Sequence, residues 1–168
     1  DRRQRQMCIR DRLKPSKPLG FRLKLTNVPA TGSRKWARYR SPNLRLLAVP
    51  VAHGETPAIA WRVEIDDYVV VFAGGFNNDK DIIRSFAKDA DALVASHAIA
   101  EASRGALRDA FALPSELGKV AAAADARMLI LAQRASRTRG RESLSRGSIE
   151  NFYKGSVLFA NDGECWGL

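Results

Sequence analysis

The sequence predicts an α/β domain with a mixed β-sheet and flanking helices. Short apolar runs of strand length recur along the body of the 168-residue chain. Between several of them, apolar residues recur at helical spacing, and turn residues separate the two kinds of segment. This alternation is typical of strands that pair with helices packed against the sheet. The chain length allows one domain core of ordinary size, and no internal repeat is present.

The first part of the sheet is expected to be a meander. Residues 44–51 form an apolar run that ends at the turn signal Ala52-His53-Gly54, and residues 58–65 alternate apolar and polar side chains. Asp66-Asp67 predicts a tight turn into a strand at 68–73. That strand is nearly all apolar, which is typical of a strand covered on both faces.

The second half of the chain predicts helices and strands in alternation. Asp79 is expected to cap a helix that contains Ile82, Ile83, Phe86 and Ala87. The remaining expected elements are a strand at 92–95, a helix over 98–110, a helix capped by Ser115 and running to 124, a strand at 127–132, a helix over 142–153 and a strand at 156–160. About six strands and four helices result, with the rhythm of βαβ units.

Positive charge is concentrated at the start of the chain. The formal net charge is +10, but residues 1–45 carry fourteen Lys and Arg against Asp1 and Asp11, and the remainder is nearly neutral. Four prolines interrupt the basic part, and it has no sustained periodicity. We therefore divide the chain into a loosely structured basic segment, 1–43, and a domain, 44–168. The first twelve residues resemble a translated adapter sequence, so they are treated as non-native.

Two interpretations of the basic segment remain open. Its Lys and Arg could bind a nucleic-acid backbone or another acidic partner, with Trp36 and Tyr39 stacking on bases. A solvated tail is the favoured interpretation, because no RNP, KH or helix-turn-helix pattern accompanies it. No apolar run is long enough to span a bilayer. Cys8 and Cys165 lie far apart in the sequence without metal-ligand spacing, which favours reduced thiols and a cytoplasmic protein.

Candidate functional residues follow the expected strands. His53, Gly74-Gly75, Ser96-His97 and Gln133 each come directly after an apolar strand, where α/β proteins assemble their sites. A structural role is the more common one for an isolated histidine, so the position of the two histidines alone does not assign them a function. The glycine pair fits a tight turn, since no Walker or dinucleotide motif surrounds it, and no GxSxG elbow is present. The basic loop that begins at Arg134 is either a solvated surface or a site for an anionic group.

Six segments, in this order, resemble the C-terminal half of the metallo-β-lactamase-fold hydrolases of the ribonuclease Z-like kind. The stretch from Val49 to Glu64 resembles the family's strand, histidine and HGxxPAxAxRxE motif, and Leu129 to Arg134 is similar to its LvLsHr motif. The other matching segments are 68–75, 87–94, 114–126 and 153–162. The resemblance implies half of an αββα sandwich that belongs to a zinc-dependent hydrolase of esters, lactones or phosphodiesters.

The same resemblance implies that most of the metal site is lost. His53 matches a ligand, whereas Gly75 and Gln133 occupy two positions where the family has an aspartate and a histidine. Glycine offers no ligand atom and an amide is a poor zinc ligand, so a hydrolytic zinc is not expected. We therefore expect a truncated or degenerate, inactive pseudoenzyme, with His97 and Arg134 as candidates for substrate binding.

Two further points belong to this interpretation. Glu55 and Asp79 are acids near the candidate site, but nothing in their spacing distinguishes them from solvated surface residues. A half-domain would also expose the sheet face that its partner half covers, and such a chain would aggregate.

Overall fold

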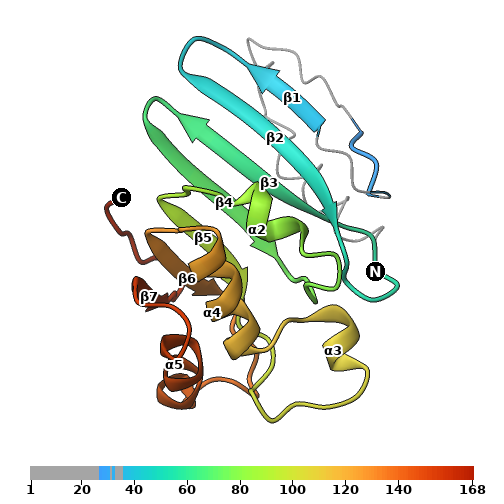
Figure 1. Ribbon diagram of the computed structural model, residues 1–168, viewed down its shortest axis with the longest axis vertical. Helices are drawn as coiled ribbons and strands as arrows, with labels where there is room; N and C mark the ends of the chain where they lie inside the picture. Colours follow the sequence, from blue (N-terminus) through green and yellow to red (C-terminus); the bar gives the residue numbers. More distant parts are fainter. Residues whose placement is uncertain (1–26, 31, 33–35) are drawn as a thin grey trace, which may run out of the picture.

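A seven-stranded mixed sheet forms the centre of the molecule (Figure 1). The computed structural model describes residues 27–30, 32 and 36–168. The strands are β1 (Trp36–Arg40), β2 (Leu44–Val51), β3 (Ala58–Ile65), β4 (Tyr68–Gly74), β5 (Ala92–Ser96), β6 (Met128–Ala132) and β7 (Ser156–Phe159). They lie side by side in chain order, with antiparallel pairing from β1 to β4 and parallel pairing from β4 to β7. The predicted α/β class with a mixed sheet is confirmed.

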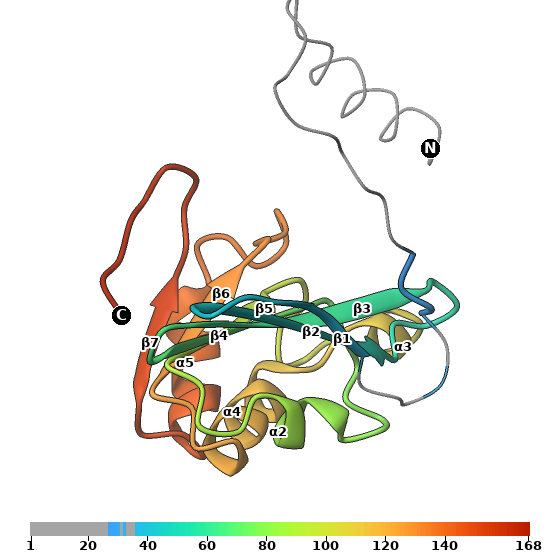
Figure 2. The same ribbon diagram turned by 90° about the horizontal axis from the view of Figure 1, so that it is seen from above.

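Three of the four described helices cover one face of this sheet. The four are α2 (Ile82–Phe86), α3 (Leu107–Ala110), α4 (Pro114–Ala123) and α5 (Glu142–Glu150). Seen along the sheet, α2, α4 and α5 lie on the same side, and the segment after β7 rises on the opposite side (Figure 2). None of the helices in the described part of the chain has the length and apolar character needed to cross a membrane.

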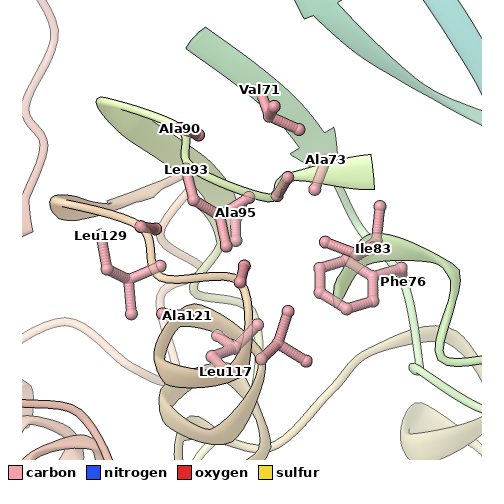
Figure 3. Close-up of a cluster of buried hydrophobic side chains, with 14 of the residues drawn as sticks. Val71, Ala73, Phe76, Ile83, Ala90, Leu93, Ala95, Leu117, Ala121 and Leu129 are labelled. Atoms are coloured by element: carbon pink, nitrogen blue, oxygen red, sulfur yellow. The ribbon is translucent and has the colours of Figure 1, made fainter. Parts of the chain in front are cut away.

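The core fills the space between the sheet and these helices (Figure 3). Val71, Leu93 and Leu129 lie next to one another on β4, β5 and β6, and all three are fully buried. Leu117 of α4 and Ile83 of α2 pack in the same cluster. Because side chains alternate between the two faces of a strand, Val70 and Phe72, which flank Val71 on β4, point to the opposite face of the sheet.

One strand lies where the sequence analysis expected loose structure. Residues 36–40 fall in the basic segment, yet they pair with β2 as the edge strand β1. The expectation is wrong at these residues because a neighbouring strand supplies their hydrogen bonds, which local periodicity does not reveal. The first twelve residues, Cys8 and most of the basic segment lie outside the described residues, as does the side chain of Trp36.

Two predicted helix caps are also wrong. Asp79 does not cap α2, which begins after Asp81, and its carboxylate instead accepts a hydrogen bond from Asn77. Ser115 lies inside the first turn of α4, because Pro114 already occupies the first helical position. The backbone N–H and the hydroxyl of Ser115 both donate to the carboxylate of Glu101.

The helix expected over 98–110 is reduced to its last turn, α3. Residues 98–106 form turns and irregular structure instead, and Ala98 and Ile99 are buried there. Ala98 and Ile99 are buried in a small cluster with Leu113, which explains why these positions are apolar. The same apolar positions also fit a helical periodicity, so the sequence pattern alone suggested a longer helix.

In the part of the chain that the structure describes, strand β4 is buried on one face and about half exposed on the other. Tyr68 and Phe72 are 49% and 47% exposed, whereas Val71 and Ala73 on the other face are buried. The expectation that both faces of this strand are covered is therefore wrong for the described chain. The apolar residues on both faces of β4 had suggested that both are covered, but the sequence does not show what the second face contacts.

Candidate functional site

The candidate residues gather at one edge of the sheet because of strand direction. The parallel strands β4, β5 and β6 end at the same edge, so Gly75, His97 and Gln133 follow neighbouring strand ends. Two antiparallel steps separate β2 from β4, so β2 also ends there, and His53 lies two residues beyond it. The predicted convergence of the loops is thus present.

His53 and Gly75 are direct neighbours. A Cβ atom placed on Gly75 would lie 2.7 Å from Cε1 of His53 and 2.8 Å from Cε1 of Phe111. The imidazole and the Phe111 ring meet edge to face, with centroids 4.8 Å apart. Together the two rings occupy the space that any side chain at position 75 would need.

The orientation of the His53 ring is fixed by the backbone. Its Nδ1 lies 2.6 Å from the carbonyl oxygen of Ala110, so Nδ1 carries the proton and donates to that oxygen. Nε2 is then the nitrogen with a free lone pair. A backbone carbonyl on one ring nitrogen is the support that metal-binding histidines commonly have, so this feature agrees with the expected ligand role, which remains a prediction.

Gln133 lies at the same edge but is held away from His53 by its own partner. Its backbone is left-handed, with φ of 48°. Its side-chain oxygen accepts a hydrogen bond of 2.5 Å from Ser96 Oγ, on the adjacent strand β5. Strand β6 is two positions from β4, about 10 Å at ordinary strand spacing. The oxygen that could approach a cation is therefore already engaged.

His97 is buried, with 1% of its surface exposed. Its Nε2 lies 2.8 Å from Ser145 Oγ of α5, and its Nδ1 has no hydrogen-bond partner in the described chain. The ring also meets Phe159 edge to face. Burial lowers the pKa of His97; the Glu142 carboxylate opposes this shift and the Arg134 guanidinium reinforces it. The imidazole therefore joins α5 to the sheet in its neutral form.

Arg134 also has partners within the chain. It donates to the Glu142 carboxylate at 2.9 Å and to the side-chain oxygen of Asn161. These contacts join the start of α5 to the segment after β7. The part in substrate binding that the sequence predicts for Arg134 and His97 stays a prediction, because their hydrogen bonds in the described chain join structural elements to one another.

A surface hollow of about 560 Å³ opens beside His53. Glu55, Asp79 and Asp109 line it, so the two acids noted in the sequence do lie near the imidazole. Asn77 also lines the hollow without having been predicted from the sequence, and its side-chain amide donates to the carboxylate of Asp79 and to the backbone oxygen of Asp109. Ala110 and Phe111 were not predicted either, because they belong to no motif and reach the site only through the fold.

The described residues do not fit a hydrolytic metal. Among them, no group of three or more His, Cys, Asp and Glu side chains is placed to hold a metal ion. A hydrolytic zinc normally has three protein ligands and an open position for water. His53 supplies one nitrogen, Gly75 supplies no atom, and the Gln133 oxygen is bonded to Ser96.

The tight contact at Gly75 gives a first prediction. Replacing Gly75 with alanine should lower the free energy of unfolding by about 1 to 3 kcal/mol, because the new methyl group must displace the His53 and Phe111 rings. Urea titration measures the change. In a protein that already carries His53→Ala, Gly75→Ala should lower the free energy of unfolding by clearly less. An equal cost in both backgrounds would mean that the imidazole does not occupy the space beside Gly75.

The buried His97 gives a second prediction. The pKa of His97 is lowered in the folded state, so below about pH 6.5 the unfolded chain binds the proton more readily than the folded chain. The contribution of His97 to the free energy of unfolding is therefore complete above about pH 6.5 and is lost as the pH falls below that value. The loss approaches about 1.4 kcal/mol per pH unit. Urea titrations at several pH values should show this loss of stability for the chain with His97 and not for the His97→Gln variant. If the free energy of unfolding depended on pH equally in both proteins, the assignment of a neutral imidazole would be wrong.

Comparison with known proteins identifies the fold. No protein-family model and no curated protein sequence matches this chain. Among solved structures it matches the metallo-β-lactamase fold protein YhfI from Bacillus subtilis, with a TM-score of 0.64, 19% identity, and coverage of 77% of this chain and 52% of that chain. The short form of human tRNase Z matches with a TM-score of 0.60, 15% identity, and coverage of 76% and 43%.

A third match, unliganded yeast PDE1, has a TM-score of 0.52, 12% identity, and coverage of 76% of this chain and 47% of that chain. The chain therefore has a metallo-β-lactamase-type fold, and the resemblance seen in the sequence is confirmed at the level of the fold. It spans about half the length of the chains it matches.

Proposed function

We propose that this chain is a degenerate part of a metallo-β-lactamase-fold hydrolase and does not hydrolyse substrates by itself. The hydrolases that it resembles act on esters, lactones or phosphodiesters, and among the matched structures one is a tRNase Z. The observation that carries the proposal is the packing at Gly75, where the His53 and Phe111 rings fill the place of a second ligand. A single imidazole is left, which is too few ligands for a hydrolytic zinc.

Metal content tests this proposal. Chain purified without chelators and then dialysed against zinc should retain well under one zinc per chain by elemental analysis, and zinc should not raise its thermal unfolding midpoint. The His53→Ala variant serves as the control and should bind equally little. A stoichiometric zinc that His53→Ala removes, or hydrolysis of a model phosphodiester or lactone that depends on it, would contradict the proposal.

The concentration of positive charge supports a second candidate function, a noncatalytic module that binds nucleic acid or another acidic partner. Fourteen Lys and Arg lie within residues 1–45, and nine of these lie outside the first twelve residues. Deleting residues 1–26 removes nine of the fourteen and leaves β1 intact. Binding to a single-stranded oligonucleotide should weaken steeply with salt and be lost in the deletion variant. Equal affinity of both chains would exclude this function. A cytoplasmic location is part of both proposals.

A further inference from the structure

The β6–α5 loop, residues 133–141, holds a group of arginines that the proposed function does not use. Arg137, Arg139 and Arg141 are all exposed. Seven other arginines of the described chain form ion pairs with carboxylates. None of the three loop arginines has such a pair with a described residue, so the loop presents three guanidinium groups to solvent.

Hydrogen bonds hold the backbone of this loop in one conformation. Thr138, at its centre, is fully buried, and its hydroxyl lies 2.8 Å from the backbone oxygen of His97 and 2.9 Å from that of Ala135. The amide of Ala135 donates to the same His97 oxygen, the amide of Arg139 to Ala135, and the amide of Arg141 to Thr138. A loop that is already ordered loses little conformational entropy when it binds a ligand.

The first residue of the loop has an unusual backbone. Gln133 is left-handed, whereas every other non-glycine residue with a positive φ in the described chain is Asp or Asn, which tolerate this conformation. Strained backbone of this kind occurs most often at functional sites. The side-chain oxygen of Gln133 is bonded to Ser96, which leaves the two amide N–H groups to donate to another partner.

The position of the loop also favours a ligand. It starts at the carboxyl end of β6, and parallel strands of α/β sheets commonly bind ligands at that edge. The carboxylate that follows the loop in sequence, Glu142, is already bonded to Arg134 and to the amide of Gly140. Because the three exposed guanidinium groups lie within five residues, their charges repel one another, and a multiply charged anion would relieve this repulsion.

We propose that the β6–α5 loop binds the diphosphate or triphosphate group of a ligand. Guanidinium groups donate paired N–H bonds that match the geometry of phosphate oxygens. One phosphate group carries up to about two negative charges near neutral pH, so three arginines match a chain of two or three phosphates. Free pyrophosphate and the phosphate chain of a nucleotide offer this same chemistry. Because no metal takes part in these contacts, this binding is independent of the proposed function.

An NMR titration of the full 168-residue chain with sodium pyrophosphate, at constant ionic strength, tests the site. The amide signal of Gly140 should shift and reach saturation. In the loop variant, Arg137→Gln/Arg139→Gln/Arg141→Gln, the dissociation constant should rise at least about 10-fold, because the charged donors are lost. Lysine at the same three positions keeps the charge and should retain most of the affinity.

A second triple variant, Arg45→Gln/Arg84→Gln/Arg127→Gln, is the matched control because it removes the same charge elsewhere. Arg45 at the start of β2 and Arg127 before β6 lie at the opposite edge of the sheet, and Arg84 lies on α2. Their ion pairs are exposed and contribute little to stability. This variant should bind pyrophosphate as tightly as the natural chain does.

A nucleoside triphosphate in place of pyrophosphate distinguishes the two sources of the phosphate chain. Tighter binding than that of pyrophosphate, again lost in the loop variant, identifies a nucleotide, and equal affinity identifies the phosphate chain alone. If circular dichroism shows that the loop variant is unfolded, Arg139→Gln alone should raise the dissociation constant about 3-fold.

Other outcomes would exclude the site. They are a Gly140 signal that pyrophosphate does not shift, an equal loss of affinity in the loop and control variants, and a single-stranded oligonucleotide that binds the loop more tightly than pyrophosphate does. Anion binding by residues 1–45 would shift the signals of that segment and leave Gly140 unchanged. The result for the loop is therefore separate from the second candidate function.

Discussion

Replacing Leu93 with alanine is expected to lower the free energy of unfolding by about 3 kcal/mol, within the range of 2 to 5 kcal/mol typical of buried leucines. Leu93 lies on the central strand β5, is fully buried, and pairs in register with Val71 and Leu129. Since strands hold its neighbours on both sides, the cavity left by the lost side chain cannot close easily. Urea titration followed by circular dichroism measures the change.

A leucine on the surface provides the control for this experiment. Leu144 is 70% exposed on α5, so Leu144→Ala should alter the free energy of unfolding by less than about 0.5 kcal/mol. If Leu93→Ala cost no more than Leu144→Ala, the cluster between the sheet and the helices would not be the core that stabilises the chain.

Replacing Gly118 with alanine is expected to cost about 2 kcal/mol or more. A Cβ atom there would lie 2.7 Å from the backbone oxygen of Ile149 and 3.0 Å from its Cα, so α4 and α5 would have to separate. Backbone atoms cannot turn aside as a side chain can, and crowding of this kind outweighs the gain of up to about 1 kcal/mol in helix propensity. Because α5 carries Ser145, the separation should also disturb the hydrogen bond to His97.

The helix α5 offers a matched control for Gly118→Ala. Gly147 lies within α5, and a Cβ atom there would meet nothing within 4 Å. Gly147→Ala should therefore stabilise the chain by about 0.5 to 1 kcal/mol. Thermal and urea unfolding of the two variants should give shifts of opposite sign. Shifts of the same sign would mean that α4 and α5 do not approach closely at Gly118.

The strands were predictable to within about a residue wherever the chain alternates or is continuously apolar between turn residues. The range predicted for β2, 44–51, matches the structure, as does the range 58–65 predicted for β3. Helix ends were less predictable, because Asp79 and Ser115 have the chemistry of caps but found other partners in Asn77 and Glu101. Whether a side chain caps a helix depends on which other hydrogen-bond partners lie near it in the folded chain, and the local sequence does not contain that information.

The candidate site was predictable as a set of strand ends but not as a set of contacts. Order along the chain and strand direction explain why His53, Gly75 and Gln133 share one edge. The backbone oxygen of Ala110 that fixes His53, and the Phe111 ring beside it, come from a segment where a longer helix was expected. Neither residue belongs to a motif, so only the fold could place them there.

The sequence by itself determined the alternation of strands and helices, the uneven distribution of charge, and the residue types at positions 53, 75 and 133. These are local properties, set by side-chain chemistry and by the two periodicities of the backbone. Only the tertiary structure decided that two rings fill the space beside Gly75, that His97 is buried, and that the helices α2, α4 and α5 all lie on one side of the sheet. Such features depend on contacts between segments that are far apart in the sequence, and packing across the sheet determines which of these contacts form.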